Sequence, residues 1–444
     1  MRIKILPAIL LTLAFFISAS AQTLDKVRLD QFFDRLAEKN KAMGNLTVAR
    51  DGKVLYTRAI GYSQINGTEK KSSTASTRYR VGSISKLFTA VMVFQLVEEG
   101  KLKLTDTLDK FFPQIPNANK ITVAQLLAHR SGIRDLTRDP EFRSWKTNAK
   151  TKDEMLAIIA KGKPDFEPDA KYSYSNSGYV LLGYIVERVS GKSYDEALRK
   201  RIAAKLGLKD TYLGTGKTEV GKNESLSYRF VRDWEQSAET DLSIPGGAGA
   251  IISTSTDLTK FTQALFDGKL VSQDSLNQMR TIKDGYGLGM QAIPLDGKTL
   301  YGHTGSIDGF HSILAYLPEE KLAIAYTSNG MIYPANKIAG GVFEIYQNKP
   351  FQIPTFETVA VSTEVLDKYI GVYSNPEAPV KFTVTRDGAT LLIQRGQSSA
   401  VPLEAAAQNK FKFEAAGVDL EFDAAKNQMI FKQGAREIVL TKQQ

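Results

Sequence analysis

One stretch of the chain restricts the fold more than any other. Residues 81–97 read VGSISKLFTAVMVFQLV, and Lys86 is the only charged residue among them. Apolar side chains fall on every side of a helix drawn through this segment, which is typical of a buried helix rather than a surface helix. The fold must therefore enclose this helix in a large core, and a chain of 444 residues is long enough for that core and for a second domain.

Ser83 and Lys86 lie three positions apart at the start of this segment. Residues with this spacing share a helix face, so the two side chains meet if the helix begins at Ser83. Burial lowers the pKa of a lysine toward the neutral amine, which is the base that a serine hydroxyl needs to become a nucleophile. The alternative is that Ser83 caps the helix while Lys86 extends to solvent, and Ser-x-x-Lys by itself leaves both interpretations open.

Two further short patterns carry candidate site residues. Tyr174-Ser175-Asn176 stands at a turn before an apolar helical segment, where a phenol can relay a proton and an amide can hold a substrate carbonyl. His303-Thr304-Gly305 ends a predicted strand, where a sheet edge can align a substrate backbone and glycine allows close approach. Each pattern alone is also compatible with a purely structural position. Arg134 and Asp135 are further candidates for the wall of a cleft.

Taken in order along the chain, Ser-x-x-Lys at 83–86, Tyr-x-Asn at 174–176 and His-Thr-Gly at 303–305 resemble the serine β-lactamase-related hydrolases. This group contains class C β-lactamases, D-alanyl-D-alanine carboxypeptidases, D-aminopeptidases and some esterases. The resemblance covers about residues 28–347, and it extends to the stretches ITVAQLLAHRSGI, YSNSGYVLLGYIVERVSG, GGAGAIISTSTDLTKF and GHTGSIDGFHS.

The resemblance implies a role for each residue of these motifs. Ser83 is expected to be the acylated nucleophile, with Lys86 and Tyr174 sharing the duties of general base and general acid. Asn176 is expected to bind the substrate amide. The backbone N–H groups of Ser83 and Ser306 are expected to form the oxyanion hole, which lowers the barrier most. The family needs no metal or other cofactor for this chemistry.

The chain departs from the family pattern on the substrate-binding strand. His303, Thr304 and Gly305 are expected to contact the substrate, together with Ser306. The β-lactamases and carboxypeptidases of this family usually carry lysine where this chain has His303. Lysine is a fixed cation, whereas histidine is mostly neutral at about pH 7. We therefore expect a weaker anchor for a substrate carboxylate, so that esters or D-amino-acid amides become more plausible substrates.

The implied fold of residues 22–347 is α+β, an antiparallel sheet flanked by helices with an added helical lobe. We expect an amphipathic helix within residues 24–42, a hairpin turning at Asp51-Gly52, and mostly helices between about 104 and 278. Four strands are expected over 286–293, 299–305, 310–318 and 321–329, followed by a helix from Pro334 to about Tyr346.

Proline spacing marks a linker over residues 348–362. Beyond it, residues 363–444 alternate apolar and polar side chains between tight turns, which predicts a small antiparallel β-barrel or sandwich. This part resembles the lipocalin-like extensions of some family members. We expect it to have a structural role, because no chemistry-bearing cluster stands out in it.

The start of the chain predicts export. Residues 1–21 combine a basic beginning, a short apolar run and the small-residue pattern Ala19-Ser20-Ala21, which is typical of a secretory signal rather than a transmembrane segment. The expected location is a bacterial periplasm. The chain has no cysteine and carries a formal net charge of +10, but its basic residues are scattered among acidic ones, so nucleic-acid binding is not expected.

The sequence thus favours an exported serine hydrolase acting on a small-molecule or peptide substrate. Peptidoglycan is one source of such substrates. A sensor that binds penicillin or peptidoglycan fragments without turnover is the alternative. Lys86 and Tyr174 argue against that alternative, because pure binding needs neither of them. The sequence leaves open which substrate is used and whether the protein is an oligomer.

Overall fold

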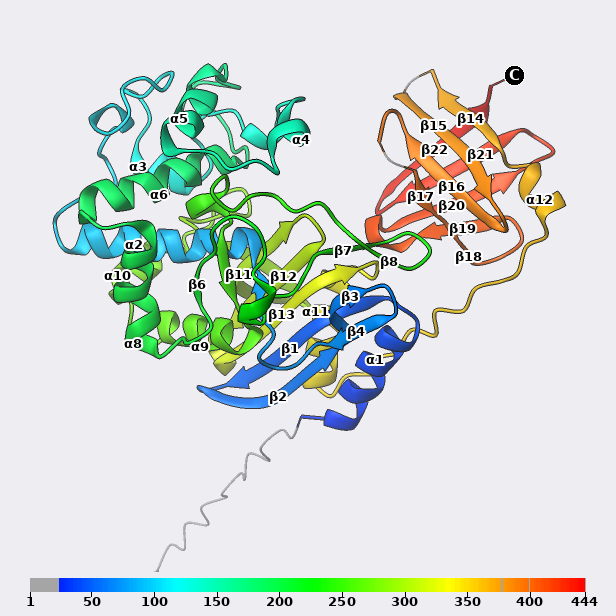
Figure 1. Cartoon of the computed structure of the whole chain (residues 1–444), viewed down its shortest axis with the longest axis horizontal. Helices are drawn as coiled ribbons and strands as arrows, with labels where there is room; N and C mark the ends of the chain where they lie inside the picture. Colours follow the sequence, from blue (N-terminus) through cyan, green and yellow to red (C-terminus); the bar gives the residue numbers. More distant parts are fainter. Residues whose placement is uncertain (1–23, 377, 399, 444) are drawn as a thin grey trace, which may run out of the picture.

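The structure, a computed structural model, describes residues 24–376, 378–398 and 400–443. The signal peptide predicted over residues 1–21 lies outside them. A larger α+β domain is followed by a smaller β-barrel, and residues 349–362 join the two without helix or strand (Figure 1). This arrangement confirms the predicted fold class.

The larger domain is built on a six-stranded antiparallel sheet in the order β10-β11-β12-β13-β1-β2. Because β1 pairs with β13, segments from the two ends of the domain lie side by side. The hairpin predicted at Asp51-Gly52 is confirmed by the pairing of β1 with β2. The strands are β1 (Ala42–Arg50), β2 (Lys53–Ile60), β10 (Gln291–Leu295), β11 (Lys298–Ile307), β12 (Phe310–Leu317) and β13 (Leu322–Met331).

Helices cover both faces of this sheet. On β1, Leu46 and Val48 point to one side, where they pack with α1 (Lys26–Glu38) and α11 (Ala335–Tyr346) in one apolar core. The predicted amphipathic helix is confirmed, since Leu29, Phe32, Phe33 and Leu36 of α1 are all buried there. Thr47 points to the other side, where its hydroxyl lies 2.8 Å from that of Ser255 in α9 (Ser255–Phe266).

The apolar segment of residues 81–97 forms α2 (Ser85–Glu98), and every residue from Ser85 to Leu96 is buried. Phe88 of α2 stacks on Phe261 of α9 with ring centres 3.7 Å apart. The predicted buried helix is therefore confirmed, and it lies between the sheet and a helical lobe (Figure 1). The other helices are α3 (Val123–Leu127), α4 (Phe142–Trp145), α5 (Lys152–Lys161), α6 (Asn176–Ser190), α7 (Tyr194–Leu198), α8 (Ala204–Leu206) and α10 (Gln273–Met279).

Two predictions about strands were incomplete. The stretch 104–278 is not only helical, because it contains four strands of two or three residues, which are too short to produce a period in the sequence. The strand predicted over 286–293 begins only at Gln291, because Tyr286 forms only isolated bridges and bends follow at residues 288 and 289. The small strands of the domain are β3 (Tyr62–Asn66), β4 (Glu69–Ser72), β5 (Tyr79–Arg80), β6 (Tyr212–Leu213), β7 (Tyr228–Phe230), β8 (Trp234–Gln236) and β9 (Ile251–Ser253).

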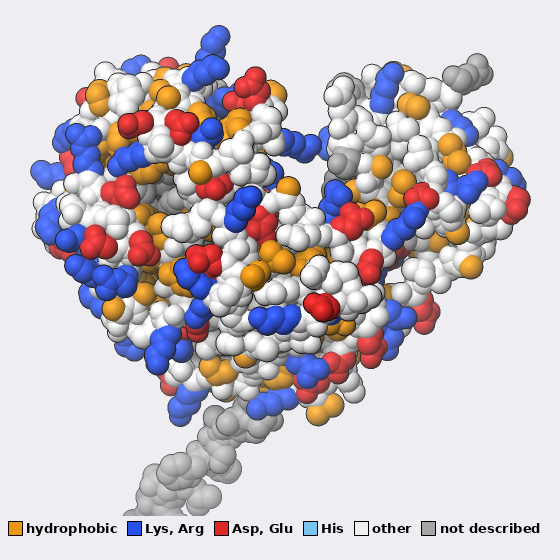
Figure 2. Space-filling model, in the orientation of Figure 1, with side chains coloured by type: hydrophobic (Ala, Val, Ile, Leu, Met, Phe, Trp, Pro, Cys, Tyr) orange, Lys and Arg blue, Asp and Glu red, His pale blue; other side chains and the backbone are white. Residues whose placement is uncertain are grey.

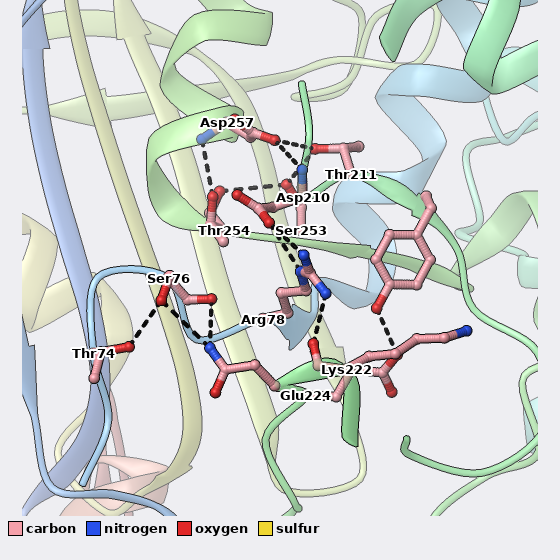
Figure 3. A network of polar contacts seen from close by, with 12 residues as sticks. Thr74, Ser76, Arg78, Asp210, Thr211, Lys222, Glu224, Ser253, Thr254 and Asp257 are labelled. Atoms are coloured by element: carbon pink, nitrogen blue, oxygen red, sulfur yellow. Dashed lines mark hydrogen bonds and ion pairs between the residues drawn. The ribbon is translucent and has the colours of Figure 1, made fainter. Parts of the chain in front are cut away.

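A polar network fixes the segment that leads into α2 (Figure 3). The Arg78 guanidinium donates to Asp210 at 2.7 Å and 2.9 Å and to the carbonyl of Lys222 at 2.6 Å. The carboxylate of Asp257, in α9, accepts the backbone N–H of Asp210 at 2.9 Å. β5 follows this segment directly and pairs with β9. The backbone that leads to Ser83 is therefore held between the helical lobe and α9.

The C-terminal domain is a nine-stranded antiparallel sheet that curls into a nearly closed barrel (Figure 1). Stacked aromatic rings fill its interior: Phe422 lies 4.6 Å from Tyr369 and 5.6 Å from Phe411, and Phe382 lies 5.1 Å from Phe431. The all-β prediction is confirmed. Its elements are α12 (Thr363–Asp367), β14 (Gly371–Asn375), β15 (Ala378–Asp387), β16 (Thr390–Arg395), β17 (Val401–Pro402), β18 (Glu404–Ala405), β19 (Lys410–Phe413), β20 (Val418–Asp423), β21 (Gln428–Gln433) and β22 (Arg436–Lys442).

The barrel docks on the larger domain through a buried lysine. The ammonium of Lys41, just before β1, is paired with the carboxylates of Glu404 and Glu414, the latter at 3.1 Å. It also lies 4.9 Å from the ring centre of Phe356, in the linker. Figure 2 shows the two domains separated by a notch on one side, with basic and acidic side chains intermixed on both of them.

Candidate active site

Ser83 lies where the chain turns from β5 into α2. Val81 donates its backbone N–H to Ile251 of β9 at 3.0 Å, and Gly82 follows with a φ of +52°. A side chain at Gly82 would lie 2.8 Å from the backbone nitrogen of Ser306, so this close approach to β11 requires glycine. The prediction that the helix begins at Ser83 needs a correction, because Ser83 belongs to a 3₁₀ turn (Gly82–Ile84) and α2 starts at Ser85.

Lys86 is completely buried, yet its ammonium group has three partners. Its Nζ lies 3.0 Å from Oγ of Ser83. It also lies 2.8 Å from Oδ1 of Asn176 and 2.8 Å from the carbonyl oxygen of Ala248. Burial lowers the pKa of Lys86 to about 7, while the nearby Asp135 carboxylate acts in the opposite direction. The interpretation of Lys86 as a chain that extends to solvent is therefore wrong.

These three contacts fit both protonation states of Lys86, since the hydroxyl of Ser83 can either accept from an ammonium or donate to a neutral amine. The oxygens of Asn176 and Ala248 can only accept, so they take the two N–H groups of a neutral Lys86. Its lone pair is then left for the hydroxyl proton of Ser83, 3.0 Å away. The two carbonyl groups thus aim the base at the serine.

Tyr174 approaches the same pair from the turn before α6. The Nζ of Lys86 lies 4.9 Å from its ring centre. Burial raises the pKa of Tyr174, and a hydrogen bond with Ser83 opposes that shift only in part. The phenol therefore stays protonated around neutral pH and is placed to exchange a proton near Ser83.

Asn176 is the first residue of α6 and connects Lys86 to a buried carboxylate. Its Nδ2 donates to Asp135 at 3.1 Å and 3.3 Å, while its Oδ1 accepts from Lys86. Asp135 also accepts the backbone N–H of Thr137 at 3.0 Å. Sequence reasoning placed Asp135 only on a cleft wall, and nothing in its local pattern indicated this connection to Lys86.

Thr304, Gly305 and Ser306 lie on the part of β11 that extends past β10. Glycine at 305 was predicted to allow close approach of a substrate. In the structure it allows close approach of the chain itself, because a side chain there would lie 2.1 Å from the carbonyl oxygen of Val81. The close contact with Val81 brings the backbone of Ser306 beside the turn that carries Ser83. Thr304 and Ser306 are exposed, and the Thr304 N–H donates to the side chain of Gln291 at 3.0 Å.

His303 points away from solvent and is only 1% exposed. Its Nδ1 lies 2.5 Å from the carbonyl oxygen of Thr304, which can only accept, so Nδ1 carries the proton. Nε2 then accepts from the hydroxyl of Tyr286 at 2.9 Å. Burial, followed by the charge of nearby Lys86, lowers the pKa of His303 to about 3. His303 is therefore neutral. Sequence reasoning missed its partner Tyr286, because it predicted only a strand at that position.

A cavity of about 240 Å³ opens beside Ser83. Among the predicted site residues, Ser83, Asn176 and Ser306 line it, whereas His303 does not. The other lining residues are Gly82, Leu136, Thr137, Phe142, Lys146, Val180, Thr240, Ile244, Pro245, Ala248, Gly249, Ile307 and Asp308. The nucleophile candidate thus faces a cavity whose walls come from the helical lobe, the loop before β9 and the end of β11.

Comparison with known proteins agrees with this geometry. The family described as Beta-lactamase matches residues 29–343, which include all the candidate site residues. The chain belongs to the beta-lactamase family. Penicillin-binding protein 4* of Bacillus subtilis is 26% identical over 443 aligned residues, covering 92% of this chain and 97% of that protein.

Two solved structures show the same relationship. The D-amino acid amidase of Ochrobactrum anthropi SV3, in complex with L-phenylalanine amide, shares 28% identity at a TM-score of 0.63 and covers 72% of this chain and 98% of its own. The octameric penicillin-binding protein homologue of Pyrococcus abyssi shares 27% identity at a TM-score of 0.64 and covers 94% of this chain and all of its own. The chain is thus a beta-lactamase-family serine hydrolase related to penicillin-binding proteins and D-amino acid amidases.

Proposed function

We propose that the protein hydrolyses an amide or ester bond through an acyl-enzyme on Ser83. The observation that carries this proposal is the 3.0 Å contact between Oγ of Ser83 and a buried amine whose pKa is lowered to about 7. A neutral Lys86 takes the hydroxyl proton as Oγ attacks the substrate carbonyl. The backbone N–H groups of Ser83 and Ser306 stabilise the oxyanion.

The leaving group then departs with a proton that passes through Lys86 and Tyr174. Water attacks the acyl-enzyme in the second half-reaction and returns its proton to the same pair, so that Ser83 is regenerated. Asn176 can serve both halves, because its Oδ1 holds Lys86 and it also lines the cavity. Atoms balance as one substrate and one water giving a carboxylic acid and an amine or alcohol.

The proposed substrate classes are small esters, D-amino-acid amides, D-amino-acid peptides and β-lactams. Neutral, buried His303 supplies no cation for a substrate carboxylate, which favours the first two classes. The D-amino acid amidase of Ochrobactrum anthropi is a relative whose name supports amides.

We also propose that the protein is exported to a bacterial periplasm after removal of residues 1–21. In the part of the chain that the structure describes, no helix combines the length and apolarity needed to span a membrane. N-terminal sequencing of protein recovered from the periplasm tests the proposal. A mature N-terminus at Gln22 is expected, and an intact Met1 contradicts processing.

The enzymatic proposal is tested by reacting the purified protein with a fluorophosphonate and with labelled penicillin. In parallel, nitrocefin, short p-nitrophenyl esters, D-alanyl-D-alanine peptides and D-amino-acid amides are screened for hydrolysis. Fluorophosphonate label on Ser83, together with turnover of at least one substrate, is expected. Ser83→Ala should lose the label and reduce kcat/KM by at least about 10³-fold.

A sensor gives a different result in the same experiment. Its penicillin label persists for hours and no substrate turns over, whereas the hydrolase recovers unlabelled Ser83. Absence of any label on Ser83 contradicts both functions. Ser85→Ala is not a neutral control, because Oγ of Ser85 accepts the N–H of Ile251 at 3.0 Å. Thr304→Ala alters an exposed residue of the predicted substrate strand and should retain the fluorophosphonate label.

A further inference from the structure

An ion pair lines the cavity beside Ser83. Lys146 follows α4 in the helical lobe, and its Nζ lies 2.6 Å from Oδ1 of Asp308, in the turn between β11 and β12. The side chain of Asp308 is only 2% exposed, and that of Lys146 is 22% exposed. A carboxylate as deeply buried as that of Asp308 is costly without a cation, so it requires Lys146.

Both members of the pair are held by further hydrogen bonds. The carboxylate of Asp308 accepts the backbone N–H of Thr240 at 2.7 Å and its hydroxyl at 2.9 Å. The Thr240 carbonyl in turn accepts from the Arg80 guanidinium at 2.6 Å, which connects it to β5. On the other side, the backbone carbonyl of Lys146 accepts the N–H of Asp241 at 2.8 Å. The ion pair is therefore a fixed part of the wall.

The remainder of the wall is mostly apolar. Among the described residues that line the cavity, Lys146 and Asp308 are the only ones with charged side chains. His303 is neutral and lies behind the wall. An acyl group entering the cavity therefore meets no unpaired charge. Its apolar contacts come from Leu136, Phe142, Val180, Ile244, Pro245 and Ile307.

We propose that Asp308 determines the charge preference of the enzyme by neutralising Lys146, so that the cavity accepts apolar, uncharged acyl groups. This inference rests on the proposed function. A carboxylate on the acyl group must compete with Asp308 for Lys146 and is repelled by Asp308. A cationic acyl group meets the same obstacle from Lys146, and either charge loses its hydration in the cavity. A neutral acyl group has neither cost, so among the proposed substrate classes this inference favours esters of uncharged acids over D-amino-acid amides, whose acyl group carries an α-ammonium.

Three p-nitrophenyl esters of matched acyl length test the proposal: the neutral hexanoate, the anionic monoester of adipate and the cationic 5-(trimethylammonio)pentanoate. The kcat/KM of each is measured from p-nitrophenolate release at low ionic strength. The wild type should prefer the neutral ester over both charged esters by about tenfold, as expected for one partly screened charge contact.

Two single substitutions should shift this preference in opposite directions. Asp308→Asn keeps a similar shape and an acceptor for Thr240 but frees the Lys146 ammonium, so the anionic-to-neutral ratio of kcat/KM should rise about tenfold. Lys146→Met leaves the carboxylate unpaired, so the cationic-to-neutral ratio should rise instead. The double variant should return both ratios to wild-type values. Glu235→Gln, which breaks an exposed ion pair with Arg229, is the matched control and should change neither ratio.

The outcomes separate this inference from the proposed function. The inference is overturned if the wild type hydrolyses the esters and neither substitution changes its anionic-to-neutral or cationic-to-neutral ratio of kcat/KM. The proposed hydrolase function then still stands. If Lys146→Met does not fold because Asp308 is left without its cation, Asp308→Asn decides alone through the anionic ester. Wild type that hydrolyses no ester and takes no fluorophosphonate label overturns the proposed function, and the inference with it.

Discussion

At the scale of residues, the candidate site is a chain of polar groups that leads from a buried carboxylate to Ser83, the proposed nucleophile. Asp135 accepts from Asn176, Asn176 accepts from Lys86, and Lys86 lies 3.0 Å from Ser83. Burial in the apolar surroundings of α2 lowers the pKa of Lys86, and Asp135 limits how far it falls. Under the proposed mechanism, Asp135 is a positioning residue that acts on Lys86 through its charge and through Asn176.

Asp135→Asn should lower the pH at which the enzyme becomes active. The carboxylate favours the charged form of Lys86, so its removal should lower the pKa of Lys86 further and move the rising limb of the pH–kcat/KM profile down by about one pH unit. Asp165→Asn removes a carboxylate that pairs with Arg134 on the surface and serves as the control. A rising limb of the pH–kcat/KM profile that stays at the same pH, or moves to higher pH, contradicts this role of Asp135.

The sequence contained much of this site but not its connections. Ser83, Lys86, Tyr174 and Asn176 could be identified because their short motifs follow one another in the family order. Asp135 could not be connected to them. Its hydrogen bond with Asn176 joins two separate segments, and their contact depends on how the helical lobe packs.

At the scale of elements, the site depends on how closely β11 approaches the turn before α2. A side chain at Gly82 would collide with the backbone of Ser306 in β11. A side chain at Gly305 would collide with the carbonyl of Val81 before the turn. The same approach places the backbone of Ser306 beside Ser83. Packing of the sheet thus sets the geometry proposed for the oxyanion hole.

Gly305→Ala should disrupt this approach. Its new methyl group would lie 2.1 Å from the carbonyl oxygen of Val81, so β11 must move away from the turn. We expect a loss of about 2 kcal/mol or more in the free energy of unfolding and at least about a tenfold loss in kcat/KM. Urea denaturation and kinetics measure the two effects. Gly340→Ala, in α11, is the control, because the nearest atom to a side chain there belongs to Leu295 and is 3.9 Å away. Equal behaviour of the two variants contradicts the account.

Elements with a clear period were predictable, and very short ones were not. The amphipathic face of α1 and the fully apolar α2 follow directly from the spacing of their side chains. Strands such as β6 and β9 contain only two or three residues and exist because they pair with each other and with β5. Tertiary contacts, not local pattern, decide such strands.

At the scale of the whole molecule, ion pairs connect the two domains: a buried lysine makes the first, and Arg232 pairs with Asp387 of the barrel in the second. Lys41 precedes β1, but its ammonium is paired with Glu404 and Glu414 of the barrel. No sequence pattern indicated this docking, because the partners lie more than 360 positions apart. Aromatic rings pack against one another inside the barrel, and its structural role stays a prediction.

Lys41→Met should loosen the docked barrel. The substitution leaves two carboxylates without their shared cation, so separation of the domains becomes easier. We expect thermolysin to cleave the segment 349–362 severalfold faster and small-angle scattering to report a larger radius of gyration. Lys39→Met alters an exposed lysine two positions away and should change neither quantity. Unchanged cleavage and size in Lys41→Met contradict the docking role of Lys41 and leave the barrel to the linker and to the ion pair of Arg232 with Asp387.

The pH dependence of fluorophosphonate inactivation tests the central claim most directly, because it reports the ionisation of the base in the free enzyme. Lys86 acts when neutral and its pKa is lowered to about 7, so the inactivation rate should rise tenfold per pH unit below 7 and level off above it. The raised pKa of Tyr174 predicts no fall at moderately alkaline pH. A rate that is independent of pH, or one that rises only near the pKa of an ordinary lysine, contradicts the account.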